Sequence, residues 1–206
     1  MATRVRTMDS AVLRSMRAKR SGTVFAPRHF QGFGSPAAVR QALSRLVKAG
    51  KIRRIRQGLY DLPLEHPVIG KTAPDPMAAV RALMEGSSAQ WQVSGAYAAN
   101  LLGLSERVPG RIVILTNGVP RRMALGKLTL VFRRAAPRNL LGAGRPTGLV
   151  IQAIRYLREQ GLEAEQLEHL RDRLDAGTRS ELSALTPKLP AWMRPIIQRL
   201  TGNDET

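Results

Sequence analysis

Cysteine is absent from this 206-residue chain, and aromatic residues make up only 4% of it. The lack of cysteine excludes disulfide frameworks, thiolate zinc sites, iron–sulfur clusters and thiol catalysis. The scarcity of aromatic residues argues against the stacked-aromatic platforms of single-strand and RNA-recognition folds. No apolar stretch approaches the roughly 18 residues of a membrane span, and the N-terminus lacks the apolar block of a signal peptide. We therefore expect a folded, cytoplasmic protein with no membrane partner.

Acidic residues are also few, and the resulting positive charge is unevenly distributed. The chain carries 33 lysines and arginines against 15 acidic residues, for a formal net charge of +18. Residues 1–61 hold fourteen of these basic side chains and two acids, Asp9 and Asp61. A run of like charge can simply be a solvated face. Its concentration in one short segment instead favours a polyanionic partner.

The first third of the chain predicts a series of short elements that ends in a longer helix and a basic hairpin. We expect a first helix capped by Asp9 or Ser10, a strand at residues 23–25 and a turn of helix at residues 28–33. The hairpin covers residues 51–61, with its turn at Gln57-Gly58. This order of elements is typical of a winged helix-turn-helix, which lays its last helix in the major groove of DNA.

The clearest single element is the helix that precedes this hairpin. Ser35 supplies the cap and Pro36 occupies the first helical position. Apolar residues then recur with the period of an α-helix, at Val39, Ala42, Leu43, Leu46 and Val47. The opposite face carries Arg40, Gln41, Ser44, Arg45 and Lys48. The pattern therefore predicts a helix over residues 35–48 with one buried and one polar face.

Prolines and glycines punctuate residues 62–76 and indicate a linker. We expect an α+β protein in which residues 1–66 form a winged helix-turn-helix DNA-binding domain. Residues 67–206 are expected to form a mixed α/β C-terminal domain with a helical tail. In that domain the patterns predict helices over residues 76–84, 94–102 and 147–159 and strands over residues 111–116 and 127–133.

Several stretches resemble the AbiEi-type antitoxins over nearly the whole chain. In the N-terminal part these are Thr23-Val24-Phe25, the helix from Ser35 to Lys48, Gly50-Lys51-Ile52-Arg53-Arg54 and Gln57-Gly58-Leu59-Tyr60-Asp61-Leu62-Pro63. The most specific block is Ala98-Ala99-Asn100-Leu101-Leu102-Gly103-Leu104-Ser105, flanked by Ser94-Gly95, Val108-Pro109 and Leu115-Thr116-Asn117-Gly118. Pro190-Ala191-Trp192-Met193 resembles the closing helical segment of the family.

The resemblance implies the antitoxin of a type IV toxin–antitoxin system, a class linked to phage defence. Such an antitoxin is encoded beside a nucleotidyltransferase-like toxin and represses their shared promoter through its winged helix. A C-terminal domain supplies the protection, and stable contact with the toxin is not required. This chain is short for the broader family, so the resemblance implies nothing about the extra C-terminal functions of longer members.

Eleven residues are expected to contact DNA. In the major groove arginine can grip guanine and glutamine can grip adenine, which suits the polar face of the 35–48 helix. Lys48, near the end of that helix, and Arg28, near the start of the helix-turn-helix, are expected to reach phosphates. The competing interpretations are an ordinary polar helix face and a solvated hairpin. The full set is Arg28, Ser35, Arg40, Gln41, Ser44, Arg45, Lys48, Arg53, Arg54, Arg56 and Gln57.

Arg121 and Arg122 lie beside Pro120 between two expected strands and predict a second basic loop. This loop is either an interaction surface for a toxin, RNA or DNA, or a solvated turn.

Signs of an enzyme are poor. His29, His66 and His169 lack the spacing of metal ligands. Gly86-Ser87 resembles the start of a nucleotidyltransferase site, but a spaced pair of aspartates does not follow it. We therefore expect no enzyme activity, catalytic residue, metal or cofactor.

The function that we expect is sequence-specific repression through duplex DNA, at an operator with inverted repeats, by an antitoxin that regulates its own promoter and counteracts its toxin. One alternative is an RNA- or ribosome-associated basic protein, which equal affinity for duplex DNA and structured RNA would favour. Another is a nuclease or nucleotidyltransferase, which metal-dependent turnover would reveal.

Overall fold

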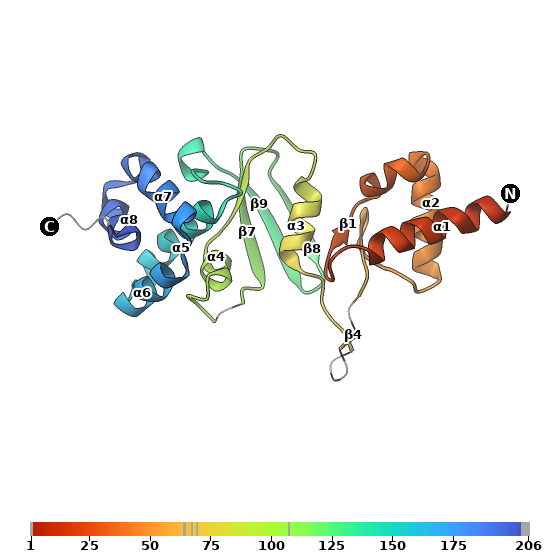
Figure 1. The fold of residues 1–206 in the computed structure, drawn as a ribbon, viewed down its shortest axis with the longest axis horizontal. Helices are drawn as coiled ribbons and strands as arrows, with labels where there is room; N and C mark the ends of the chain where they lie inside the picture. The colour runs from red at the N-terminus through yellow and green to blue at the C-terminus, as the bar shows by residue number, and fades with distance from the viewer. Residues whose placement is uncertain (1, 64, 67, 69, 107, 203–206) are drawn as a thin grey trace. The chain divides into compact units, whose positions relative to one another are not determined.

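The computed structural model describes residues 2–63, 65–66, 68, 70–106 and 108–202 and divides the chain into two compact units (Figure 1). Unit 1 runs to Ser87 and unit 2 begins at Ser88. Both units combine helices with a small sheet, so the chain is a mixed α/β protein, as the sequence predicted at this coarse level. In the part of the chain that the structure describes, no helix is both long and apolar enough to cross a membrane.

Unit 1 consists of helices around a three-stranded antiparallel sheet with the strand order β1-β3-β2. Its residue Asp61 pairs with Val24 on one side and with Arg53 on the other. A separate two-stranded sheet, β4-β5, follows. In chain order the elements are α1 (Ala2–Arg17), β1 (Val24–Phe25), η1 (Pro27–Phe33, a 3-10 helix), α2 (Pro36–Lys48), β2 (Arg53–Arg56), β3 (Leu59–Asp61), β4 (Glu65–His66), β5 (Gly70–Lys71) and α3 (Pro76–Met84).

Helix α2 forms as the sequence predicts. The hydroxyl Oγ of Ser35 accepts a hydrogen bond from the backbone N–H of Ala38 at 3.2 Å, and Pro36 begins the helix. The side chains of Val39, Ala42, Leu43 and Leu46 are buried. These positions lie on one face of the helix, which anchors α2 in the interior of unit 1.

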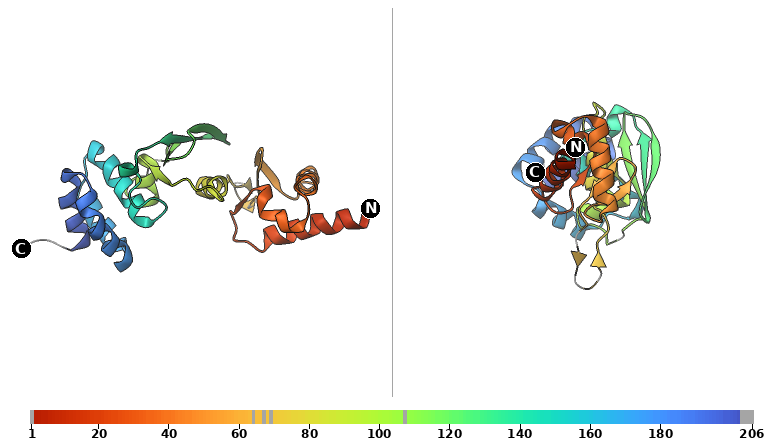
Figure 2. Two further views of the ribbon diagram at one scale, coloured as in Figure 1. Left: turned by 90° about the horizontal axis from the view of Figure 1, so that it is seen from above. Right: turned by 90° about the vertical axis from the view of Figure 1, so that its right-hand side faces the viewer.

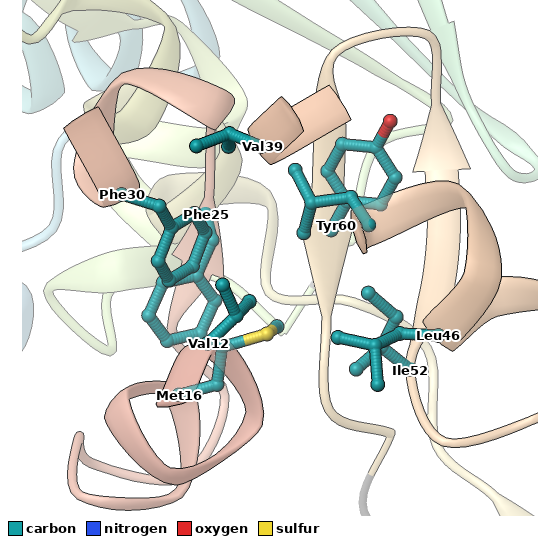
Figure 3. Close-up of a cluster of buried hydrophobic side chains, with 9 residues drawn as sticks. Val12, Met16, Phe25, Phe30, Val39, Leu46, Ile52 and Tyr60 are labelled. Carbon is teal, nitrogen blue, oxygen red and sulfur yellow. The ribbon is translucent and has the colours of Figure 1, made fainter. Parts of the chain in front are cut away.

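The core of unit 1 joins α1, η1, α2 and the sheet (Figure 3). The rings of Phe25 and Phe30 stack with their centroids 5.7 Å apart. Met16 of α1 and Leu43 of α2 are almost fully buried in the same cluster. Its other buried members are Val12, Val39, Leu46, Ile52 and Tyr60. Because one apolar cluster joins α1, η1 and α2 to strands β1 and β3, the exposed side of α2 is presented on a fixed support.

The start of α1 differs from the sequence prediction. The helix begins at Ala2, so neither Asp9 nor Ser10 is its cap. The carboxylate of Asp9 instead accepts two hydrogen bonds from the guanidinium of Arg45, in α2. A capping signal and an interhelical ion pair require the same residue type, and the sequence around Asp9 favoured the wrong one of these two roles.

The boundary between the units also differs from the predicted 66/67 division. The segment 62–76 was expected to be a linker, but it contains the β4-β5 pair, and α3 after it packs against β1. Asp75 caps α3 by accepting a hydrogen bond from the N–H of Met77 at 2.8 Å. Arg28 donates a hydrogen bond to the carbonyl of Ala82, and His29 Nε2 contacts the carboxylate of Glu85. These contacts make α3 part of unit 1.

A fragment of residues 1–87 is expected to be more stable than a fragment of residues 1–66. The shorter fragment lacks α3, so it loses the partners of Arg28 and His29 and uncovers β1. Its melting temperature, measured by circular dichroism, should be lower by at least about 5 °C. Arg28→Ala in the longer fragment should produce part of this loss. Equal melting temperatures for the two fragments would show that α3 does not belong to the folded unit.

Unit 2 is built on a four-stranded sheet with the order β6-β7-β9-β8, in which β7 and β9 are parallel. Ile112 and Ile114 of β7 pair with Leu130 and Phe132 of β9, and all four side chains are buried. After the sheet, α5 packs on α7, and α8 contacts both α6 and α7 (Figure 2). The elements are β6 (Trp91–Ser94), α4 (Ala96–Leu101), β7 (Arg111–Thr116), β8 (Arg121–Leu125), β9 (Leu128–Arg134), η2 (Pro137–Asn139), α5 (Pro146–Gln160), α6 (Ala164–Arg173), α7 (Ala176–Leu185), η3 (Thr186–Lys188), η4 (Ala191–Met193) and α8 (Arg194–Thr201).

Candidate nucleic-acid interface

The exposed face of α2 carries a row of polar side chains. Four of the predicted DNA-contacting residues lie on it, and all are exposed: Arg40, Gln41, Ser44 and Lys48. They lie opposite the buried face of the helix, as the helical period requires. Among the residues that the structure describes, none of these four side chains has an interaction partner. We call this surface the α2 face; its donors and acceptors are available to a ligand.

The hairpin of β2 and β3 supplies further exposed polar groups. Gly58 has a φ of +78°, which L-residues other than glycine rarely adopt, so the turn at Gln57-Gly58 forms as predicted. A register shift between Arg54 and Arg56 interrupts the pairing with β3. Arg54 and Gln57 are exposed, whereas Arg56 is half-buried and engaged in an interaction within the chain. Of the three arginines in β2, Arg54 is therefore the one whose guanidinium is exposed and has no partner among the described residues.

Two of the predicted contacts, Arg45 and Arg53, already form ion pairs inside unit 1. Arg45 binds both carboxylate oxygens of Asp9, with Nη2 to Oδ1 at 2.7 Å and Nε to Oδ2 at 3.0 Å. The hydrogen bond to Asp9 raises the pKa of Arg45. Arg53 binds the buried carboxylate of Asp61, with Nε to Oδ1 at 2.9 Å, and this hydrogen bond likewise raises the pKa of Arg53. Their geometry assigns these arginines a role in holding α2 and the hairpin in place.

Arg28 and Ser35 have partners as well. The guanidinium of Arg28 reaches the carbonyl of Ala82, which ties η1 to α3. The hydroxyl of Ser35 caps α2. Both residues are exposed, but the guanidinium of Arg28 and the hydroxyl of Ser35 form hydrogen bonds that stabilise unit 1.

Sequence reasoning missed several cations that the structure leaves exposed and without a described partner. Lys51 lies in the turn between α2 and β2, and Lys19 and Arg20 follow α1. The basic run ending at Arg20 was visible in the sequence, but nothing there placed it relative to the α2 face.

Arg121 and Arg122 do not lie in a loop. They begin the edge strand β8, which pairs antiparallel with β9. The guanidinium of Arg121 lies over the ring of Phe132, 4.6 Å from its centroid, and Arg122 is exposed. Adjacent residues of a strand point to opposite faces, so these two arginines do not form one binding loop.

The residues that carry the resemblance in unit 2 make structural contacts. Asn100 donates from Nδ2 to the carbonyl of Ser105 at 2.9 Å, and Gln166 of α6 donates to the carbonyl of Leu104 at 3.1 Å. Thr116 donates from Oγ1 to the carbonyl of Gln90 at 2.7 Å. The blocks at residues 98–105 and 115–118 therefore stabilise the turns that follow α4 and β7.

Comparisons with known proteins identify a family but no function. None of the curated proteins matches the chain. Among solved structures, the crystal structure of the RV2827C protein from Mycobacterium tuberculosis is similar, with 18% sequence identity and a TM-score of 0.43, over 97% of this chain and 82% of that one. Residues 11–182 match the family described as "Family of unknown function (DUF6088)". Since this match spans most of both units, the chain belongs to the DUF6088 family.

Proposed function

We propose that unit 1 is a winged helix-turn-helix that binds duplex DNA in a sequence-specific manner. The observation that carries the proposal is the α2 face, a row of exposed groups without described partners on a helix whose other face is buried in the core. The order of helices, strand and basic hairpin supports it, as does the large excess of basic residues in residues 1–61.

In this proposal the two surfaces of unit 1 have different tasks. The α2 face enters the major groove, where Arg40 reads guanine through O6 and N7 and Gln41 reads adenine through N6 and N7. Arg54 and Gln57 of the hairpin contact the sugar–phosphate backbone together with Lys48. Backbone contacts fix the register of the protein on the duplex, whereas the base contacts specify the sequence.

We further propose that the protein is the antitoxin of an AbiE-like type IV toxin–antitoxin system. Support for this comes from the resemblance of its sequence to AbiEi-type antitoxins. It would act in the cytoplasm, repress its own promoter at an operator with inverted repeats, and counteract a nucleotidyltransferase-like toxin through unit 2.

Arg40→Ala and Gln41→Ala are each expected to weaken binding to the cognate site by about 1–3 kcal/mol and to relax the preference at one base pair. The reason is the loss of a bidentate base contact. Arg54→Ala should instead weaken binding to cognate and random duplexes by a similar factor, since it removes a phosphate contact. Selection of bound duplexes from randomised DNA gives the cognate site, and titrations of each variant give the affinities.

The same titrations separate this proposal from its alternatives. If Arg40→Ala and Arg54→Ala reduced cognate and random binding equally, the α2 face would not read bases. Equal affinity of the wild type for structured RNA and duplex DNA would point to an RNA-associated protein.

The antitoxin role is tested by expressing the full chain with its cognate toxin, with the toxin under an independent promoter. Growth should be rescued by the wild type and also by Arg40→Ala, because repression of the native promoter plays no part in this arrangement. Failure of the full chain to rescue growth would reduce the function to that of a transcription factor.

A further inference from the structure

Unit 2 contains a long stretch of chain without a single acidic residue. Between Glu106 and Glu159 the sequence has neither aspartate nor glutamate, but it is rich in basic residues. This stretch forms most of the sheet, η2 and most of α5. The exposed cations of this stretch are solvated, whereas a cation that the fold partly buries requires a partner in the fold or a ligand.

Three arginines lie in α5 or directly before it, and their guanidinium groups have different kinds of partner. Arg145 forms an ion pair with Glu181 of α7, with Nη1 to Oε1 at 2.5 Å. Arg158 lies over the ring of Trp192, 4.2 Å from its centroid. Arg155 is half-buried, and its described hydrogen bond is from Nη1 to the side-chain oxygen Oδ1 of Asn139 at 2.6 Å. Arg155 alone of the three has neither an acidic nor an aromatic partner among the described residues.

A second arginine, Arg138, directly precedes Asn139, the residue whose side chain binds the guanidinium of Arg155. Burial, and next the positive charge of Arg138 in η2, lowers the pKa of Arg155. Arg138 is exposed and has no described partner. The Nε atom of Arg155 is buried and makes no hydrogen bond to any described residue. Two neighbouring guanidinium groups without a carboxylate are unfavourable, since the charged form of the buried one is desolvated and repelled.

The arrangement is held in place by neutral groups. Gln152 of α5, which is buried, donates from Nε2 to the carbonyl of Asn139 at 2.9 Å. Asn139 therefore receives one hydrogen bond from Gln152 and another from Arg155. These bonds fix η2, and with it Arg138, against the middle of α5. The backbone segment that carries Arg138 and the guanidinium of Arg155 are thus both held in place by the fold.

We infer that Arg138 and Arg155 form a binding site for a phosphate group. The planar guanidinium fork matches the oxygen geometry of phosphate, and charge-assisted hydrogen bonds of this kind are strong. Two cations suit an oxyanion that carries up to two negative charges better than they suit a single carboxylate. The phosphate belongs either to a nucleic-acid backbone or to a small phosphorylated ligand. The site lies in unit 2, so it does not depend on DNA binding by unit 1.

The site is tested with the full chain and inorganic phosphate. At matched ionic strength, phosphate should raise the melting temperature more than chloride does, and it should shift the NMR resonance of the buried Nε–H of Arg155. Arg138→Gln should weaken phosphate binding by at least about tenfold, because one charge-assisted partner is lost. Arg155→Gln keeps a donor for Asn139 but removes the charge, and should weaken binding at least as much.

Lys127→Gln provides the matched control, since it removes an exposed cation of the same acid-free stretch in the turn between β8 and β9. This variant should bind phosphate like the wild type. Equal effects of phosphate and chloride on the wild type would overturn the inference, as would unchanged phosphate binding by Arg138→Gln. That variant alters an exposed side chain, so its result remains interpretable even if Arg155→Gln fails to fold.

Two further probes identify the source of the phosphate. A nucleoside monophosphate and a short duplex are titrated in the Arg40→Ala/Arg54→Ala background, in which unit 1 is impaired. Stronger binding of the duplex, lost in Arg138→Gln, identifies a nucleic-acid backbone. Stronger binding of the monophosphate identifies a small phosphorylated ligand.

Discussion

The affinity of the protein for duplex DNA is expected to fall by about 250- to 1,000-fold when monovalent salt rises from about 50 to about 200 mM. Each phosphate that the protein neutralises contributes about −0.9 to the slope of log K against log salt. Besides Arg40, which reads a base in the proposal, exposed cations of unit 1 without described partners include Lys48, Lys51 and Arg54, with Lys19 and Arg20 after α1. About five such contacts give a slope of about −4 to −5.

Single variants assign this salt dependence to particular residues. Arg54→Gln should reduce the slope by about 1, since it removes one phosphate contact. Lys188→Gln, which removes an exposed cation of unit 2 at η3, should leave the slope unchanged. A slope near zero for the wild type would reject the electrostatic part of the proposed function, whatever the sequence preference of the protein.

Local signals in the sequence predicted individual elements well. Ser35 and Pro36 mark the start of α2 because a cap and a first-turn proline act within a few residues. Gln57-Gly58 marks the hairpin turn for the same reason. The strand β7 was predicted at its observed residues, because Ile112 and Ile114 are β-branched and lie within a continuous apolar run.

Strands without such signals were missed. The strand β6 is short and contains Gln92, which is buried and accepts a hydrogen bond from the N–H of Gly144 through Oε1 at 3.0 Å. The strand β8 begins with two arginines and lacks β-branched residues, so it was predicted to be a loop. Its position depends on pairing with β9, a tertiary contact that overrides weak local propensity.

The candidate site was only partly predictable for a related reason. The helical period separates the α2 face from the buried face, so Arg40, Gln41, Ser44 and Lys48 could be placed from sequence alone. The partners of Arg45 and Arg28 lie 36 and 54 residues away in the chain. A basic residue that is free to bind a ligand and one that is held by a distant acid or carbonyl look the same in a sequence.

Arg53 provides the sharpest test of that distinction, because its loss should destabilise unit 1 rather than remove a DNA contact. The carboxylate of Asp61 is 4% exposed, and it receives hydrogen bonds from Nε of Arg53 at 2.9 Å and from Nη2 at 2.5 Å. Arg53 also donates from Nη1 to the carbonyl of Thr72 at 2.7 Å. Arg53→Ala leaves a buried charge unpaired, and should reduce the free energy of unfolding by about 2–4 kcal/mol in denaturant titrations.

Two comparisons distinguish loss of stability from loss of a DNA contact. Arg54→Ala, at the neighbouring exposed position, should change the free energy of unfolding by no more than about 0.5 kcal/mol while weakening DNA binding. The double variant Arg53→Met/Asp61→Leu removes both charges, so it should recover much of the stability that Arg53→Ala loses. It should also bind DNA nearly as well as the wild type, because the guanidinium of Arg53 is held by Asp61. If Arg53→Ala were as stable as the wild type but bound DNA as poorly as Arg54→Ala, Arg53 would belong to the interface after all.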